Sequence, residues 1–385
     1  MKITGEWIES PKTQSVCTTL EEHGYQALFV GGCVRNALLG APIQDVDIAT
    51  DAKPQDVLEV FERKGFKTAP TGIDHGTVTV VAEGTPFEIT TFRKDVATDG
   101  RRAVVSFSDD VQADARRRDF TVNAIYAKPN GEVLDPLNGM PDIEARHIRF
   151  IEDPETRIRE DYLRILRFFR FHANYGNAAR GLDPDGLAAC TRLHAGIEKL
   201  SRERVGSEMR KLLAAKNPTE SVTAMAHAGV LDVVIEDAND TALARLIEVE
   251  SQIDLEPDSM RRLVALGGED VAQRLRLSRK DARTLDVLSR EAADTKPAAE
   301  LGYLLGEKRS LDVLALSAAR LGGFVQDKDV VAARIGSAVE FPITSADLKP
   351  FFQGKDLGDQ LRKLESIWIE SDFQLSKEQL LRRMS

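Results

Sequence analysis

The hydrophobic and polar positions in the first third of the chain predict alternating strands and helices. Four short runs are apolar throughout or alternate with a period of two, as strands do; they are residues 27–30, 45–50, 77–82 and 86–92. Helical spacing follows the first two runs, at residues 34–39 and 53–65, and Pro54 lies in the first turn of the second helix. The start of the chain is therefore predicted to be a mixed α/β unit.

Two segments after these runs complete the predicted unit. Residues 93–115 are polar and rich in charge, which indicates a long loop. Residues 124–135 alternate around Asn130-Gly131, a dipeptide that favours the two-residue turn of a β-hairpin.

From about Asp153 the pattern changes to a helical period, and no convincing strand follows. Residues 155–175 are predicted to form one long helix that ends before Gly176. Residues 201–215 are predicted to form another, with Ser201 as its N-cap. The remaining residues carry helical patterns without a fixed repeat. We therefore predict an α/β head followed by an all-helical arm.

Composition and charge narrow the possibilities. A chain of 385 residues suggests roughly two to four structural units. Its net charge of −10 argues against a protein that coats nucleic acid through charge alone, but leaves room for one local basic groove. No apolar run approaches the ~18 residues that cross a bilayer, and the polar N-terminus shows no secretory signal. Cys17, Cys33 and Cys190 are scattered, as in a reducing, cytoplasmic environment, and offer no zinc spacing.

Two acidic residues lie in the second strand run. A period of two places Asp45 and Asp47 on one face of the strand, with Val46 and Ile48 on the other. Two carboxylates ~7 Å apart along a strand repel each other, and a cation between them resolves the repulsion. Mg²⁺ prefers oxygen ligands, and a two-metal site serves phosphoryl or nucleotidyl transfer. On its own, however, such a pair is more often a solvated strand edge.

A glycine-rich turn precedes this pair. Gly31 and Gly32 join the first strand run to the first helix, which carries Arg35. Glycines let a triphosphate approach the backbone, the helix N-terminus supplies N–H groups, and Arg35 can pair with phosphate oxygens. A plain helix start is the alternative, but a phosphate cradle followed by a candidate metal pair is much less common.

The segment from Gly31 to Thr50, GGCVRNALLGAPIQDVDIAT, resembles the opening motif of the class II tRNA nucleotidyltransferases (CCA-adding enzymes) and of bacterial poly(A) polymerases. Both belong to the DNA polymerase β nucleotidyltransferase superfamily. The usual motif has Asp where this chain has Asn36. The resemblance continues, motif by motif, over residues 27–215.

The resemblance implies an α+β fold. A polymerase β-like nucleotidyltransferase head with a small mixed sheet would occupy residues 1–150 and hold the metal and triphosphate site. A helical neck would follow at residues 151–215, and residues 216–385 would form a helical body and tail that bind RNA. The implied cofactor is Mg²⁺, held by Asp45 and Asp47.

Glu88 is a candidate third catalytic carboxylate. It projects from a predicted strand on the same face as Thr90. Members of the superfamily often place a carboxylate on a neighbouring strand, although an exposed strand glutamate is an equal alternative.

Residues 116–126, RRRDFTVNAIY, resemble the family's element for recognising the ribose of the nucleotide. Arg117 and Arg118 offer forked donors, while Asp119 and Asn123 can bond a 2′-hydroxyl. Because that hydroxyl distinguishes NTP from dNTP, the segment is a candidate nucleotide-binding element.

The sequence EDYLR, from Glu160 to Arg164, resembles the family's base-reading EDxxR motif, and Arg167 and Arg170 follow it. On one helix Asp161, Arg164 and Arg167 share a face, and Glu160 can pair with Arg164 and fix its rotamer. Asp161 would accept from the exocyclic amine of C or A, and Arg164 would donate to the ring acceptors beside it, which disfavours U and G. Pairs at this spacing also occur simply because they stabilise exposed helices.

Smaller features bear on the choice of product. Residues 71–80 resemble the CCA-adding version of that region, the C-terminus lacks a basic extension, and residues 93–115 are long enough for a flexible loop that permits the final A. Residues 201–213 resemble a helix that braces the neck, so we assign them a structural role. The resemblance implies addition of C, C and A to the tRNA 3′ end from CTP and ATP. A poly(A) polymerase, a split-function CC- or A-adding enzyme and a non-catalytic RNA-binding relative are alternatives, and the oligomeric state stays open.

Overall fold

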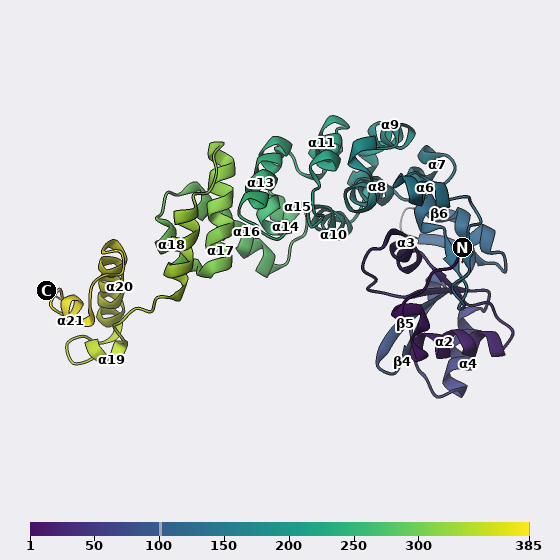
Figure 1. The fold of residues 1–385 in the computed structure, drawn as a ribbon, viewed down its shortest axis with the longest axis horizontal. Helices are drawn as coiled ribbons and strands as arrows, with labels where there is room; N and C mark the ends of the chain where they lie inside the picture. Colours follow the sequence, from purple (N-terminus) through teal and green to yellow (C-terminus); the bar gives the residue numbers. More distant parts are fainter. Residues whose placement is uncertain (100–101, 385) are drawn as a thin grey trace. The chain divides into compact units, whose positions relative to one another are not determined.

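The computed structural model describes residues 1–99 and 102–384, and the side chains outside residues 95–105. Two compact units divide the chain, Met1–Glu236 and Asp237–Ser385. Figure 1 draws the ribbon of both. The expected division into head, neck, body and tail is finer than this and stays a prediction.

A seven-stranded mixed sheet forms the centre of the first unit. Its strand order is β3-β4-β5-β2-β1-β8-β9, in which β2 and β5 are parallel neighbours and the other pairings are antiparallel. The strands are Leu28–Val30 (β1), Asp47–Thr50 (β2), Lys67–Gly72 (β3), Thr77–Ala82 (β4), Thr85–Thr91 (β5), Tyr126–Ala127 (β8) and Val133–Leu134 (β9). The four predicted strands, the hairpin at residues 124–135 and the mixed sheet are confirmed, and β3 is an additional strand.

Helices cover the sheet where its strands are apolar. All three residues of β1 are buried, whereas β4 alternates and buries Val78, Val80 and Ala82. Helices α2 (Pro11–Glu22) and α4 (Pro54–Arg63) pack against β4, each through one apolar face. This packing fixes the central strands, whose ends carry the polar side chains of the candidate site.

The first unit contains further helices around this sheet and beyond it: α1 (Glu6–Glu9), α3 (Gly32–Leu39), α5 (Val111–Arg116), α6 (Met140–Ala145), α9 (Pro184–Leu193), α10 (Arg202–Leu213), α11 (Thr219–His227) and α12 (Val230–Val234). The helices predicted at residues 34–39, 53–65 and 201–215 correspond to α3, α4 and α10. Ser201 occupies the N-cap position of α10, but its side chain makes no capping hydrogen bond.

The loop predicted at residues 93–115 is wrong. The described residues form an antiparallel hairpin of β6 (Arg93–Asp99) and β7 (Arg102–Phe107), which is followed by α5. The two strands form a sheet of their own, separate from the central sheet. The many charged residues of the segment, such as Arg93, Lys94 and Asp95, led to the prediction of a loop, although residues 102–107 contain an alternating apolar set.

The single helix predicted at residues 155–175 is also wrong. Two helices occupy this stretch, α7 (Pro154–Glu160) and α8 (Leu163–Tyr175). Asp161 interrupts them with an extended backbone, φ −154° and ψ 106°. Its carboxylate accepts a hydrogen bond from the Leu163 backbone N–H at 3.1 Å, a local bond that competes with helix continuation. Asp161, Arg164 and Arg167 therefore do not lie at successive turns of one helix, although Gly176 follows the last residue of α8 as predicted.

An aromatic cluster holds α8 against the sheet-bearing part of the first unit. The ring centroids of Phe120 and Phe150 are 5.0 Å apart, and those of Phe150 and Phe168 are 5.3 Å apart. Phe171 lies 5.1 Å from Phe120. All four side chains are buried, so the polar face of α8 has a fixed position beside residues 119–123.

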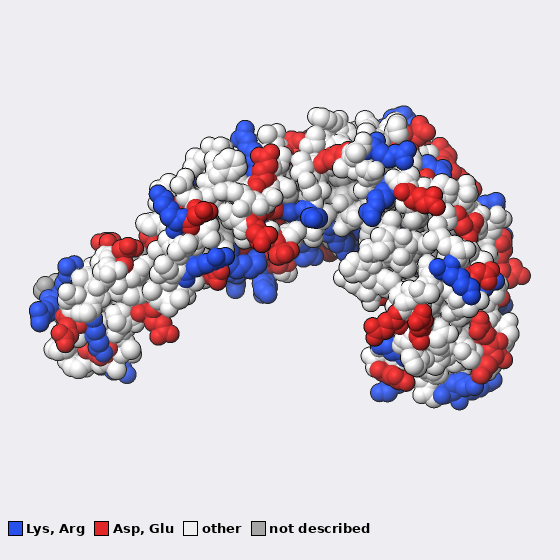
Figure 2. Space-filling view, viewed as in Figure 1, with Lys and Arg blue, Asp and Glu red and all other residues white. Residues whose placement is uncertain are grey.

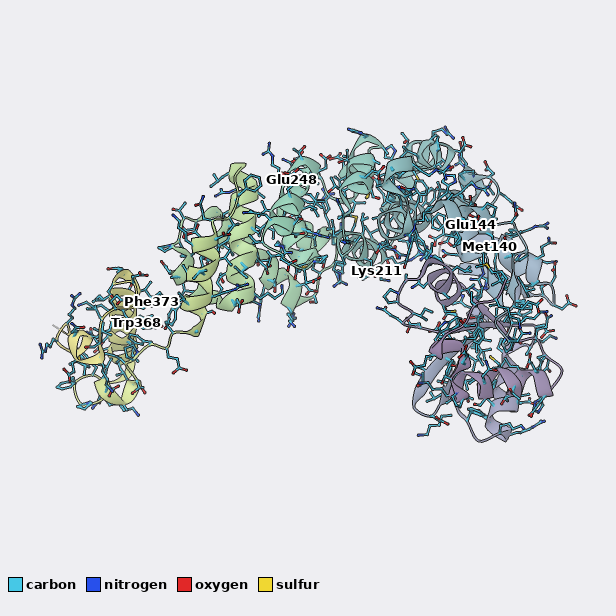
Figure 3. The ribbon with its side chains drawn as sticks, viewed as in Figure 1. Met140, Glu144, Lys211, Glu248, Trp368 and Phe373 are labelled. Atoms are coloured by element: carbon cyan, nitrogen blue, oxygen red, sulfur yellow. The ribbon has the colours of Figure 1, made fainter. Side chains whose placement is uncertain are left out.

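The second unit is helical throughout its described residues. Its helices are α13 (Asp240–Gln252), α14 (Ser259–Leu266), α15 (Val271–Arg274), α16 (Arg279–Ala293), α17 (Ala298–Leu321), α18 (Asp327–Ala338), α19 (Ser345–Leu348), α20 (Gly354–Glu370) and α21 (Lys377–Leu381). Trp368 and Phe373, labelled in Figure 3, belong to an apolar cluster and have ring centroids 4.9 Å apart. Among the described residues, none of the helices combines the length and apolar character of a membrane span.

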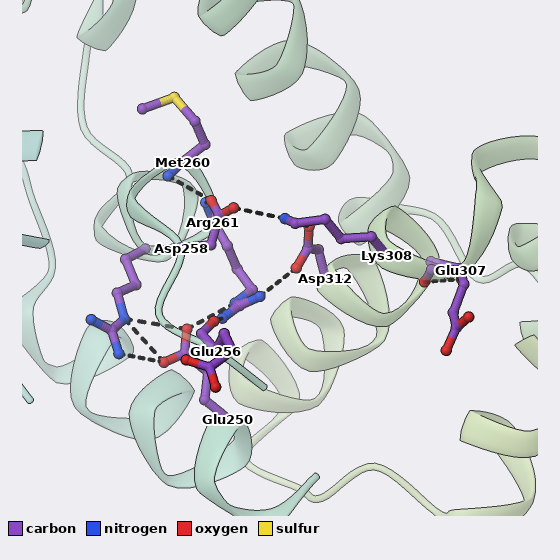
Figure 4. A network of polar contacts seen from close by, with 10 residues as sticks. Glu250, Glu256, Asp258, Met260, Arg261, Glu307, Lys308 and Asp312 are labelled. Carbon is purple, nitrogen blue, oxygen red and sulfur yellow. Dashed lines mark hydrogen bonds and ion pairs between the residues drawn. The ribbon is translucent and has the colours of Figure 1, made fainter. Parts of the chain in front are cut away.

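A buried ionic network lies inside the second unit (Figure 4). Arg261 donates to Glu250 at 2.8 Å and also to Asp312, and Arg262 donates to Glu250 at 2.7 Å. Lys308 pairs with Asp312 at 3.2 Å from the edge of the network. Arg261 and Arg262 are each 1% exposed, so their charges depend on these carboxylates for compensation.

Candidate active site

A cavity of about 770 Å³ opens in the first unit between the ends of the central strands and helices α8 and α10. One part of its wall is acidic and contains Asp45, Asp47 and Glu88. Another part contains the glycine turn, and a third contains basic and polar side chains: Arg35, Arg118, Asp119, Asn123, Arg167 and Arg170. The structure thus brings together most of the residues that the sequence singled out, from segments far apart along the chain.

The acidic wall is built by two parallel neighbours in the sheet. Asp47 opens β2 and lies beside Glu88 of β5 in the strand register. Asp45 precedes β2 rather than belonging to it, yet it lines the same cavity. Burial first, then the charges of Glu88 and Asp45, raise the pKa of Asp47 to about 6, against a smaller opposing effect of Arg118. Mutual repulsion of this kind is relieved when a cation binds between carboxylates.

The carboxylates of the acidic wall would supply only some of the ligands of a divalent cation. Within the described residues, no three His, Cys, Asp or Glu side chains already form a ligand cluster. Mg²⁺ is commonly held by one or two carboxylates together with the phosphates of a substrate, so Asp45 and Asp47 match its preferred donors. Their role as metal ligands, and the role of Glu88, stay predictions.

The glycine turn lines the same cavity and follows β1, the strand that pairs with β2. Gly31 has φ 72° and ψ −123°, a conformation that side chains rarely adopt, and α3 begins at the next residue. A Cβ added at Gly31 would lie 3.6 Å from the Arg118 guanidinium, and one at Gly32 would lie 3.8 Å from that of Arg35. Backbone N–H groups at the start of α3 therefore lie between two arginines, an arrangement suited to phosphate oxygens.

Arg35 is held almost entirely by neutral oxygens. Its guanidinium donates to Asn123 Oδ1 at 2.6 Å, to Asn36 Oδ1 at 2.8 and 3.1 Å, and to the Tyr175 hydroxyl at 2.9 Å. The Tyr175 ring also lies under it, with 4.0 Å from Cζ to the ring centroid. Burial lowers the pKa of Arg35, and the nearby charge of Asp119, which is not bonded to it, acts in the opposite direction without offsetting burial. Asn36, which replaces the usual Asp, thus fixes the rotamer of Arg35 without neutralising it.

Asp119 and Asn123 form the polar floor of the cavity. Asn123 donates to Asp119 Oδ1 at 2.9 Å, and Arg167 donates to Asp119 Oδ2 at 2.7 Å. Although burial acts in the opposite direction, the charge of Arg167 lowers the pKa of Asp119 to about 2. The resulting chain of contacts from Arg167 to Arg35 connects α8 with α3 and keeps Asp119 ionised.

The two adjacent arginines of the ribose element separate in the structure. Arg118 lines the cavity and donates to Asp114 at 3.0 Å and to the Tyr126 hydroxyl at 3.1 Å. Arg117 also donates to Asp114, at 2.7 Å, but does not line the cavity. Against the effect of burial, the charges of these arginines lower the pKa of Asp114 to about 2. Arg117 is therefore positioned to support Arg118 through Asp114.

The EDxxR residues lie outside the cavity wall. Arg164 pairs with Glu160, as predicted, and it also donates to the backbone carbonyls of Arg157 at 2.8 Å and Arg117 at 3.0 Å. Asp161 accepts from Arg204 at 2.6 Å. The structure therefore places these side chains next to the ribose element, with which Arg164 is in direct contact.

Comparisons with known proteins identify the family. A family model described as "Poly A polymerase head domain" matches residues 27–149, and "Probable RNA and SrmB- binding site of polymerase A" matches residues 181–241. The CCA tRNA nucleotidyltransferase 1, mitochondrial, of Danio rerio is 31% identical over 95% of this chain and 88% of its own length. The chain belongs to the CCA tRNA nucleotidyltransferase family.

Other members of this family agree with the assignment. The CCA-adding enzyme of Streptococcus pneumoniae is 39% identical over 66% of this chain and 63% of its own length. The Bacillus stearothermophilus CCA-adding enzyme, solved in complex with CTP, superimposes with a TM-score of 0.75 and 27% identity, over 97% of this chain and 96% of that one. The Thermotoga maritima CCA-adding enzyme, at 19% identity and a TM-score of 0.68, has the same fold. The predicted α+β class and family are therefore confirmed.

Several residues of this nucleotidyltransferase site did not follow from the sequence. Tyr175 contacts Arg35 and lies one turn beyond Phe171 on α8, a helical spacing that could have indicated it. Lys211 of α10, labelled in Figure 3, lines the cavity, although its segment was assigned a structural role. The same helix supplies Glu208, which pairs with Arg170. Helix α10 therefore both braces α8 and contributes a cation to the cavity.

Proposed function

We propose that this protein completes the 3′ end of tRNA by adding C, C and A from CTP and ATP, with release of pyrophosphate. One observation carries the proposal. In a chain similar to CCA tRNA nucleotidyltransferases over nearly its whole length, one cavity brings Asp45, Asp47 and Glu88 together with a glycine turn and Arg35. Acidic groups that attract a divalent cation thus share a cavity with groups that attract a triphosphate.

Asp45 and Asp47 are the proposed ligands of Mg²⁺. An ion bound there would offset the negative charge of the triphosphate and lower the pKa of the RNA 3′-hydroxyl. Glu88 adds negative charge beside Asp47 and strengthens the attraction for a cation. The carboxylates would fix the position of that ion, and one of them can accept a hydrogen bond from the attacking hydroxyl.

The glycine turn and Arg35 receive the phosphates of the nucleotide. The N–H groups at Gly32 and the guanidinium of Arg35 stabilise the β- and γ-phosphates as negative charge develops on the leaving pyrophosphate. Arg35 is suited to this role because the side chains bonded to it are neutral, so no direct ion pair occupies its guanidinium. Arg118 and Lys211 add positive charge to the same cavity.

Asp119 and Asn123 are proposed to recognise the ribose. Asp119 stays ionised at neutral pH because Arg167 lowers its pKa, so it accepts a hydrogen bond from a 2′-hydroxyl. A deoxynucleotide lacks this donor and would leave a buried carboxylate oxygen with one fewer partner. The arrangement therefore selects NTP over dNTP.

Selection of C and A remains assigned to Asp161 and Arg164. Each side chain already has protein partners, Arg204 for Asp161 and Glu160 for Arg164. These contacts fix both side chains, and each keeps unused hydrogen-bonding capacity, since a guanidinium has five N–H groups and a carboxylate about four acceptor sites. Base recognition by this pair requires the nucleotide to approach beyond the cavity wall, beside Arg117.

The test is incubation of the purified protein and Mg²⁺ with tRNA lacking its 3′ CCA, with each labelled NTP alone and then with CTP and ATP together. We expect two C residues, then one A, and then arrest. Asp47→Asn should lower the rate by more than about 10³-fold, while the exposed Asp74→Asn, outside the cavity, should leave it unchanged. Long A tracts would identify a poly(A) polymerase, arrest after CC a split-function enzyme, and no incorporation would contradict the proposal.

The proposal also includes a cytoplasmic location. Three cysteines, Cys17, Cys33 and Cys190, are buried and unpaired with one another, as expected of a protein that folds in a reducing compartment. Fractionation of cells that express the protein at its natural level tests this part.

A further inference from the structure

Three exposed cations occupy the first part of helix α16 in the second unit. Arg279, Lys280 and Arg283, hereafter the α16 patch, lie at spacings of three and four residues and so share one face of the helix. Within the described part of the chain, none of the three takes part in an ion pair or a side-chain hydrogen bond. In Figure 2, Lys and Arg side chains gather along the lower edge of the helical region beneath the position of α16.

The position of the α16 patch destabilises helix α16. The N-terminus of a helix carries partial positive charge, so cations in its first turns are unfavourable there. Arg279 and Arg283 are also like charges one turn apart, which adds repulsion. Asp281 is the acidic residue of the first turn, and it is occupied by the Ser278 hydroxyl at the N-cap, at 2.9 Å. A patch that destabilises its own helix is understandable where an anionic partner compensates the charge.

We propose that the α16 patch binds the sugar–phosphate backbone of the tRNA substrate. The inference rests on the proposed function and assigns part of the RNA surface of the second unit. Residues 275–293 contain no aromatic side chain, so the patch is not built to stack unpaired bases. Three long, unpaired cations on one face instead match the spaced phosphates of a duplex, which a protein binds by shape and charge rather than by sequence.

The charge of the whole chain strengthens this inference. At a net charge of −10, the chain as a whole repels a polyanion, so association with tRNA requires local positive surfaces. Several arginines and lysines of the second unit pair with carboxylates, such as Arg334 with Glu307 at 3.0 Å and Lys377 with Asp347 at 2.6 Å. Others, such as Arg309 and Lys328, are exposed and have no ion pair among the described residues, but the α16 patch gathers three such cations within five residues. The α16 patch keeps its charge available to a partner outside the chain.

The test compares tRNA binding by the full-length protein and by the triple variant R279Q/K280Q/R283Q over a range of salt concentrations. Each lost phosphate contact lowers the slope of log K against log salt by about 0.7 to 0.9, so the slope should fall by about 2 to 3. The Kd for tRNA lacking CCA should rise on the order of tenfold at moderate salt. The kcat at saturating tRNA and the KM for CTP should stay unchanged, because none of the three residues lines the cavity.

Two matched variants separate this binding from other effects. The variant R279K/K280R/R283K keeps the charges and should bind tRNA as the natural protein does. The variant K2Q/K53Q/K67Q removes three exposed charges from the first unit, away from the cavity, and should change the Kd much less. An unchanged Kd and salt slope in R279Q/K280Q/R283Q, or an equal loss in K2Q/K53Q/K67Q, would overturn the inference. Neither result would affect CCA addition by the natural protein, which tests the proposed function separately.

Discussion

Two buried arginines, one in each unit, differ in the kind of group to which they are bonded. In the second unit, Arg261 is 1% exposed and bonded to two carboxylates, Glu250 and Asp312, as well as to the Glu256 carbonyl at 2.6 Å. In the first unit, Arg35 is 6% exposed and bonded only to amide and hydroxyl oxygens. Both guanidiniums are fixed, but Arg35 has no carboxylate bonded to it, feels Asp119 only from a distance and lines a cavity. Neutralised charges hold a fold together, whereas an uncompensated one is available to an anionic ligand.

The largest expected effect is a loss of stability when the buried ionic network around Arg261 is disrupted. Arg261→Gln leaves Asp312 with Lys308 and Glu250 with Arg262 in a buried site. We expect a loss of about 3 to 5 kcal/mol in the free energy of unfolding, because an incompletely paired buried charge is costly. Denaturant unfolding followed by circular dichroism measures it.

Arg290→Gln is the matched control for this change. Arg290 pairs with Glu291 at 2.8 Å, but its side chain is 72% exposed. Loss of a surface pair should cost no more than about 1 kcal/mol. If the two variants unfolded at the same denaturant concentration, the ionic network would not be what stabilises the second unit.

Arg35→Gln should reduce activity strongly and change stability little, the opposite of Arg261→Gln. Because the charge of Arg35 is proposed to stabilise the departing pyrophosphate, kcat/KM for CTP should fall about 10² to 10³-fold. Its partners Asn36, Asn123 and Tyr175 are neutral, so the free energy of unfolding should change far less than in Arg261→Gln. Steady-state kinetics with saturating tRNA and the same unfolding assay measure both quantities.

Arg63→Gln provides the control in the first unit. Arg63 is exposed and pairs with Glu59 at 3.2 Å, outside the cavity. It should retain full activity. A large loss of stability without loss of activity in Arg35→Gln would mean that Arg35 belongs with Arg261, as part of the fold.

Tyr175→Phe should reduce kcat/KM for CTP less than Arg35→Gln does. The change removes the hydroxyl that accepts from Arg35 at 2.9 Å and keeps the ring beneath the guanidinium. The bond is one of four that hold the guanidinium, so kcat/KM for CTP should fall only about two- to tenfold, which corresponds to roughly 0.5 to 1.5 kcal/mol. Tyr25→Phe, outside the cavity, should have no effect, and an equal effect of both changes would remove Tyr175 from the site.

The sequence predicted the parts of this architecture that have a local signal. The strands β4 and β5 showed a period of two, α3 and α4 showed helical spacing, and the motif around Asp45 and Asp47 indicated the site. The hairpin of β6 and β7 was missed because the high charge of residues 93–115 outweighed the short alternation in residues 102–107. The break at Asp161 was missed because a single bond from its carboxylate to the Leu163 N–H interrupts an otherwise helical pattern.

The partners of Arg35 could not have been predicted in this way. Asn123 and Tyr175 lie 88 and 140 positions away along the chain, and only folding brings them to the guanidinium. The same holds for Arg167 and Asp119, which are 48 positions apart. Motifs therefore indicated which residue types belong to the site, whereas the distribution of charge among them required the structure.

A small effect is also expected from giving Arg35 a carboxylate partner, as Arg261 has. Asn36→Asp would place a carboxylate where the Asn36 oxygen now accepts from Arg35 at 2.8 and 3.1 Å. The new ion pair should compensate part of the charge and weaken the attraction for the triphosphate. We expect the KM for CTP and for ATP to rise together by about three- to tenfold, which corresponds to the roughly 1 kcal/mol that a partly exposed ion pair contributes.

The change also removes the bond from Asn36 Nδ2 to the Pro42 carbonyl, now 2.6 Å, but that carbonyl is accessible to water and can find another donor. Asn36→Ser loses this bond and the bonds from Arg35 without adding charge, so it is the control for every effect of the change other than the new charge. If both variants raised KM equally, compensation of the charge on Arg35 would not be what limits nucleotide binding.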